Sequence, residues 1–197
     1  CHYTEHGFDA VSLWWPKLSD LHLFEARGLL DSAGVRVSSI QWPGGFTGSE
    51  GQTFQESLED GYEAIDIAEQ LHCPLVVLRT GARAGHTLSH ARRLIQLALA
   101  ELAPAAEAVG VSLVIKATQA EAGFLTSLSD ALSILEVSSY PNVGLAIDLW
   151  SHSEELISSQ RESSLLERIK IVSVADRVKG VSSSSERLPP GFGDLPL

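Results

Sequence analysis

Methionine is absent from this chain of 197 residues, and cysteine occurs only at Cys1 and Cys73. Two cysteines form neither a disulfide framework nor a four-cysteine metal site, so we expect a reducing, cytoplasmic setting. No apolar run approaches the roughly 18 residues of a membrane-spanning helix, and no basic start precedes an apolar stretch, so neither a membrane span nor a signal peptide is expected. Chains of this length usually carry some methionine, which indicates a fragment or a sequence with residues missing.

Positive charge is also scarce. Lysine and arginine together number 14 against 25 acidic residues, which gives a formal net charge of −11. Nucleic-acid binding depends largely on neutralising phosphates, so we expect no nucleic-acid partner. A local basic patch around Arg79, Arg83, Arg92 and Arg93 is one interpretation of the few arginines, and solvated positions on helix surfaces are the simpler one.

The chain does contain six short apolar segments, and a helical pattern follows nearly every one. Continuous Val/Ile/Leu runs are typical of strands buried on both faces, and intervening helices make such strands parallel. The predicted strands are Val11–Leu13, Val35–Ile40, Leu75–Leu78, Val111–Ile115, Val143–Ile147 and Ile169–Ala175. The predicted helices are Leu18–Ala33, Phe54–Leu71, Thr87–Val109, Ser127–Val137 and Leu156–Ile169. We therefore expect a single α/β domain over residues 1–197.

A polar or aromatic side chain ends each predicted strand. The carboxyl ends of parallel strands meet at one edge, which is where barrel enzymes keep their active sites. A doubly wound sheet would instead require a G-x-G-x-x-G turn after a strand, and the nearest segment, Gly81–Gly85, has the wrong spacing. The pattern therefore favours a barrel. The strand-end residues are Trp14, Trp15, Gln41, Arg79, Lys116, Asp148 and Asp176.

Longer segments carry a family resemblance in their order and spacing. They are Asp60–Ala68, Leu78–Gly81 with Gly85–Thr87, Glu101–Ala106, Gly110–Ile115, Val143–Asp148 and Pro190–Leu195. Together they resemble the xylose isomerase-like TIM barrels, the sugar phosphate isomerase/epimerase superfamily that also includes endonuclease IV (the AP endonuclease family 2 type). The resemblance implies a (β/α)8 barrel that is incomplete here, with the first and last strands absent.

The resemblance also implies a metal-assisted mechanism. A divalent cation (Mn²⁺, Mg²⁺ or Zn²⁺) on the barrel axis polarises a substrate carbonyl, while a carboxylate moves a proton between adjacent carbons. Asp148 matches the aspartate ligand of the family. Lys116 stands where the family has a glutamate ligand, and Ser173 where it has a histidine. The second histidine would fall at Ser151, one residue before His152, so we expect a depleted metal site with Asp148 as the remaining ligand.

Lys116 and Asp148 are our candidate catalytic residues. They end neighbouring parallel strands, whose backbones lie roughly 5 Å apart. We hypothesise that the Lys116 ammonium occupies the space of the missing metal and pairs with Asp148, because pairing lowers the cost of burying a charge. The alternative is that both side chains point to solvent at the base of a loop.

Six further residues are candidates for substrate binding, and each has a plainer alternative. Aromatic rings at a barrel mouth suit stacking on sugar faces, but Trp14, Trp15 and Trp42 would serve equally to cap the core. His86 and His90 have the i, i+4 spacing of a metal-binding pair, yet a capping histidine beside a surface histidine is commoner. Asp176 and Arg177 would bind hydroxyls or form a salt bridge between neighbouring loops. The candidates are Trp14, Gln41, Arg79, His86, Asp176 and Arg177.

Three functions are consistent with these observations. The first is a sugar, sugar-phosphate or polyol isomerase or epimerase with an altered centre. The second is a non-catalytic module that binds a sugar-like ligand on the same barrel. The third, an endonuclease IV-like repair enzyme, is opposed by the charge and by the lack of a His/Glu/Asp-rich site. We expect a small carbohydrate-like ligand and leave a homo-oligomer open.

Overall fold

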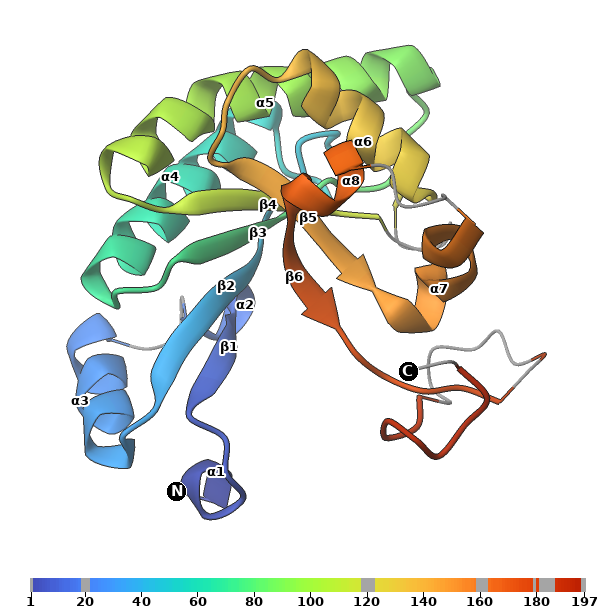
Figure 1. Ribbon diagram of the computed structural model, residues 1–197. Coiled ribbons are helices and arrows are strands. Elements are labelled where there is room, and N and C mark those ends of the chain that lie inside the picture. Colours follow the sequence, from blue (N-terminus) through green and yellow to red (C-terminus); the bar gives the residue numbers. More distant parts are fainter. Residues whose placement is uncertain are drawn as a thin grey trace.

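The computed structural model describes residues 2–18, 22–117, 123–158, 163–178, 180 and 187–195. Its six strands form one sheet in the order β1 to β6, and every neighbouring pair is parallel, as predicted. Figure 1 shows this sheet curving, with β1 and β6 at its two edges and the longer helices along its outer side. The strands are β1 (Ala10–Trp14), β2 (Arg36–Gly44), β3 (Leu75–Arg79), β4 (Ser112–Lys116), β5 (Val143–Asp148) and β6 (Ile169–Ser173).

The helices α4, α5 and α6 begin at side-chain caps that the sequence provides. Thr53 and Glu56 form a capping box at the start of α4, in which each side chain bonds the backbone N–H of the other. Thr87 and Ser127 accept N–H groups at the starts of α5 and α6. The helices are α1 (His2–Glu5), α2 (Trp15–Leu18), α3 (Leu23–Ala33), α4 (Phe54–Gln70), α5 (Leu88–Ala108), α6 (Leu128–Val137), α7 (Leu149–Ser158) and α8 (Ser163–Arg168).

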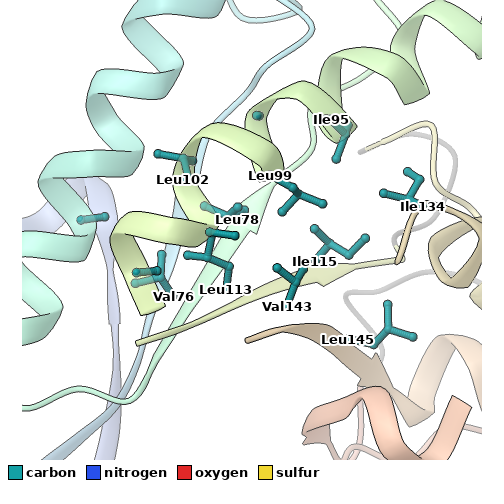
Figure 2. Packing of buried hydrophobic residues seen from close by; sticks show 14 of the residues in the cluster. Val76, Leu78, Ile95, Leu99, Leu102, Leu113, Ile115, Ile134, Val143 and Leu145 are labelled. Carbon is teal, nitrogen blue, oxygen red and sulfur yellow. The ribbon is translucent and has the colours of Figure 1, made fainter. Parts of the chain in front are cut away.

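The main hydrophobic core lies between the outer face of the sheet and the helices. Figure 2 shows Leu99 and Leu102 of α5 lying over the side chains of Leu78 and Leu113 from the strands. These residues are almost completely buried, and such burial supplies most of the stability of an α/β layer. This helix-covered face accounts for every second residue of the apolar runs seen in the sequence.

The inner face of the sheet carries a smaller apolar cluster. Val77, Val114 and Ala146 form its buried centre, and Leu75 and Ile171 pack against it. Side chains alternate along a strand, so the residues two positions further on lie on the same face. At the carboxyl edge those residues are polar: Arg79, Lys116, Asp148 and Ser173.

Two predicted helices and one strand need correction. The predicted helix Leu18–Ala33 is replaced by α2 and α3, with residues 19–21 outside the described part of the chain. The predicted helix Leu156–Ile169 instead corresponds to α7, which begins at once after β5 because Asp148 accepts the Trp150 N–H (3.2 Å), and to α8. β6 ends at Ser173, because Asp176 leaves the sheet to pair with Leu188 in an antiparallel bridge.

Among the described residues, no helix has the combined length and hydrophobicity that a membrane crossing requires.

Candidate functional site

The predicted contact between Lys116 and Asp148 is present. Lys116 Nζ donates to Asp148 Oδ2 across 3.2 Å, from the end of β4 to the end of β5. Lys116 lies beside Ala146 of β5 in the strand register. Because side chains alternate along a strand, the next residue of β5 on the same inner face is Asp148. The Asp148 side chain is only 3% exposed and that of Lys116 is 22% exposed, so the carboxylate lies buried behind the ammonium.

A second cation, which the sequence gave no reason to expect, also holds Asp148. Arg187 Nη1 donates to Oδ1 (3.1 Å) and Nη2 donates to Oδ2 (2.6 Å), so the contact is bidentate. Arg187 follows Asp148 by 39 residues and lies outside the helices and strands that the structure describes, in a part of the sequence without a periodic pattern. Both oxygens of Asp148 are therefore engaged by cations, with the Trp150 N–H as a further donor to Oδ1.

These partners determine how Asp148 ionises. Burial by itself would raise the pKa of Asp148, because a charged carboxylate loses its hydration. The hydrogen bond from Arg187 and the positive charges of Lys116 and Arg187 outweigh that effect, and the pKa lies below its ordinary value. Asp148 is therefore an anion at neutral pH.

A buried tryptophan supports the two arginines of this edge. The guanidinium carbon of Arg187 lies 5.1 Å from the ring centre of Trp150, and that of Arg177 lies 5.8 Å from it. Both distances are within the range of cation–π attraction. Arg177 also donates to Glu154 Oε1 (2.9 Å), which is a salt bridge between neighbouring segments, as one interpretation of the sequence expected. A substrate contact by Arg177 stays a prediction.

Asp176 has a structural role in its loop, and a contact with substrate stays a prediction. Its side chain is fully buried, and its carboxylate accepts four backbone N–H groups at 2.8–3.0 Å. A Cβ on Gly193 would collide with Oδ1, so this close approach requires glycine. Burial would raise the pKa of Asp176, but the backbone donors together hold it below the ordinary value. The donors are Arg177, Gly191, Gly193 and Leu195.

Two other predicted residues lie together near the loop that follows β2. Arg79, at the end of β3, forms an ion pair with Glu50 and donates to the Gly44 carbonyl (3.4 Å). His86 Nε2 donates to the Thr47 carbonyl (3.1 Å). These contacts hold the loop against the strand end, and substrate binding by Arg79 and His86 stays a prediction.

The histidine pair and the strand-end tryptophans have mixed surroundings. The ring centres of His86, in the loop before α5, and His90, in the first turn of α5, are 4.8 Å apart. Trp15 is buried in the core, whereas Trp14 and Trp42 are each about half exposed. Trp15 therefore caps the core, and a stacking role remains open for Trp14.

Gln41 lies on the inner face beside two serines. Its Nε2 donates to the hydroxyls of Ser12 and Ser39, both at 3.3 Å, and these hydroxyls bond each other at 2.8 Å. The amide is thus part of a polar network between β1 and β2, and contact with a substrate stays a prediction.

The donor set around Asp148 does not fit a divalent metal. Its two oxygens hold Lys116 and Arg187, and a cation there would be repelled by both. His152, the nearest histidine in sequence, is buried and donates to the Thr126 carbonyl (3.4 Å). Over the described ranges, no three His, Cys, Asp or Glu residues are grouped to hold a metal ion. No step through a metal is therefore assigned here.

Two cavities lie away from this edge. One, of about 430 Å³, is lined by Leu97 of α5 and Val137 and Tyr140 at the end of α6. The other, of about 700 Å³, is lined by Arg27 and by Arg36 and Leu75 at the amino ends of β2 and β3. Neither contains the strand-end cations, so the candidate site is defined by its charged groups.

Comparisons with known proteins agree with this architecture. The family model described as "Xylose isomerase-like TIM barrel" matches residues 3–197. No curated protein matches the sequence. Among solved structures, a protein from Sinorhizobium meliloti 1021 is similar with a TM-score of 0.83 and 24% identity, over 98% of this chain and 73% of that one.

Two further structures show the same fold. The IolI protein, solved with a bound zinc atom, gives a TM-score of 0.78 and 16% identity over 98% of this chain and 73% of that one. The 3-keto-D-glucoside 4-epimerase YcjR from E. coli gives 0.76 and 14% identity over 93% of this chain and 76% of that one. The predicted α/β barrel, incomplete over this chain, is confirmed by the parallel sheet and these matches.

Proposed function

Because this chain belongs to the xylose isomerase-like TIM-barrel family, we propose that it binds a small carbohydrate at the carboxyl edge of its sheet and acts on it as an isomerase or epimerase. The observation that carries the proposal is the convergence of Lys116 and Arg187 on the buried Asp148. The site lies at the strand ends, where barrels of this kind perform their chemistry. The epimerase activity of the structurally similar E. coli protein supports the same class of substrate.

The cations supply the electrostatic part of such a reaction. Moving a proton between adjacent carbons of a sugar places negative charge on a carbonyl oxygen in the transition state. Preorganised N–H donors aimed at that oxygen stabilise the charge. Lys116 and Arg187 are such donors, and Asp148 fixes their positions from behind. Lys116 is the donor that a substrate oxygen meets first, because its ammonium is partly exposed whereas Asp148 is buried.

A non-catalytic sugar-binding module is the second candidate. One observation favours it: Asp148, which aligns with a metal-ligand position of the family, is occupied by two cations. In that case the edge would still hold a ligand by charge-assisted hydrogen bonds. No proton transfer would follow.

Hydrogen exchange separates the two candidates. Isomerases and epimerases that work by proton transfer exchange a substrate C–H with solvent, which NMR detects in D2O as loss of a proton signal. We expect exchange in at least one member of a panel of aldoses, ketoses and their phosphates, and we expect EDTA to leave it unchanged. Lys116→Met should abolish the exchange and Arg36→Met, at the opposite edge of the sheet, should not. Binding of a sugar without exchange would support the module instead.

A further inference from the structure

We propose that the ligand of this site carries an anionic group, a carboxylate or a phosphate, which binds against Lys116 and Arg187. The inference rests on the proposed function in taking the ligand to be a sugar derivative. It goes further in specifying the charge of that ligand. Three features of the site support it: the local charge, the exposure of its members and the hydrogen-bond donors that remain.

The local charge is positive in a strongly acidic protein. Lys116 and Arg187 carry two positive charges against the single negative charge of Asp148. Arg177, which also lies near the Trp150 ring, is paired one to one with Glu154 and leaves this excess unchanged. An excess cation at a strand end attracts an anion, and the attraction is strongest where the surroundings are partly desolvated.

Exposure decides which charge an incoming ligand meets. The side chains of Lys116 and Arg187 are 22% and 38% exposed, whereas that of Asp148 is 3% exposed. The carboxylate thus lies beneath the cations, and a ligand reaches the cations first. The surface pair Arg36–Asp9 is the opposite case, because its side chains are 77% and 78% exposed and present both signs to solvent equally.

Donors remain for a second anion. A guanidinium has five N–H donors and an ammonium has three. Asp148 accounts for two contacts from Arg187 and one from Lys116 in the described part of the chain. The guanidinium fork suits carboxylate and phosphate oxygens better than single hydroxyls, because two parallel bonds form at once.

The experiment compares four probes by isothermal titration calorimetry: D-glucose, D-glucuronate, D-glucose 6-phosphate and inorganic phosphate. We expect at least one of the two acidic sugars to bind at least tenfold more tightly than glucose, with the preference reduced at high salt. The glucuronate and phosphate arms show which anion the site takes. Arg187→Met should remove the preference, and Arg187→Lys should retain part of it. Arg36→Met, which removes the same side chain from a surface pair, should leave it unchanged.

Circular dichroism and thermal melts select the variants that remain folded, and Arg187→Lys serves if Arg187→Met does not fold. Equal binding of glucose and the acidic sugars would overturn the inference, as would a preference that survives Arg187→Met. Absence of binding by every anionic probe, inorganic phosphate included, would also overturn it. Exchange of a sugar C–H with solvent, found for neutral sugars without any anion preference, would overturn this inference and still support the proposed function. Anion preference without exchange would support this inference and overturn the proposed isomerase or epimerase activity.

Discussion

Two buried aspartates near the carboxyl ends of the strands are stabilised as anions in different ways. Asp148 is held by side-chain cations, Lys116 and Arg187. Asp176 is held by four backbone N–H groups of its own loop. Both arrangements keep the carboxylate ionised, because the pKa of each lies below its ordinary value. The difference is in what remains available to a ligand.

The backbone N–H groups around Asp176 form hydrogen bonds inside the protein, whereas the partly exposed side chains of Lys116 and Arg187 have further N–H donors that a ligand can meet. Around Asp176 the N–H groups of Gly191, Gly193 and Leu195 fix the turn that follows Leu188. Leu188, which precedes this turn, pairs with Asp176 in the antiparallel bridge, and its neighbour Arg187 contacts Asp148. Asp176 is therefore a structural group that places one member of the candidate site, and Asp148 is the group the site is built around.

The largest expected effect comes from removing both cations. Lys116→Met combined with Arg187→Met leaves Asp148 buried and unpaired, and removal of the partners of a buried charge costs about 3–5 kcal/mol of unfolding free energy. Urea denaturation of the double variant measures this loss. Each single variant should lose clearly less, because the other cation remains.

Two controls sharpen that measurement. Arg36→Met breaks an exposed ion pair and should cost under about 1 kcal/mol. Adding Asp148→Asn to the double variant should recover part of the lost stability, because no buried charge then remains. A loss from the double variant no larger than that of Arg36→Met would contradict the description of Asp148 as a buried, charge-held group.

A more local effect is expected from Asp176→Asn. An amide NH2 would face two of the four backbone donors, whichever way the side chain is turned. We expect hydrogen exchange at Gly191, Gly193 and Leu195 to become on the order of tenfold faster, with the exchange in β3 and β4 unchanged. Unaltered protection of these three amides would show that the carboxylate does not organise the loop.

The smallest effect is the acid dependence of stability. The folded pKa of Asp148 is depressed, so its stabilising contribution is fully present above its unfolded pKa of about 3.9 and is lost as the pH falls through the folded value. The difference in unfolding free energy between the wild type and Asp148→Asn should therefore be constant near neutral pH and shrink below about pH 4. A difference that grows on acidification would have the wrong sign for a depressed pKa.

The sequence predicted the sheet and one pair of the site because both follow from local patterns. Buried apolar runs separated by helices indicated parallel strands, and parallel strands bring their carboxyl ends together. Lys116 and Asp148 end adjacent strands on the same face, so their contact could be inferred from chain order. Among the described residues, what surrounds Asp148 is a pair of cations and no cluster of three metal-ligating side chains.

The rest depended on irregular chain, where no periodicity restricts position. Arg187 lies outside the described helices and strands, and nothing in the neighbouring sequence indicates that it would reach Asp148. For Asp176 the sequence left a substrate contact and a salt bridge open, because a strand end gives the position of a residue but not the orientation of its side chain; its burial against backbone N–H groups was not predicted. The glycines are a signal that could have pointed to this loop, because Gly191 has a positive φ and Gly193 leaves no room for a Cβ beside the Asp176 carboxylate.

The most direct test of the central claim is a carboxyl titration by NMR with ¹³C-labelled aspartate, in the wild type and in Arg187→Met. We predict that the pKa of Asp148 lies below its ordinary value in the wild type and rises when Arg187 is removed, while the pKa of Asp176 stays low in both. An Asp148 that titrates in its ordinary range in the wild type, or that does not respond to the loss of Arg187, would contradict it.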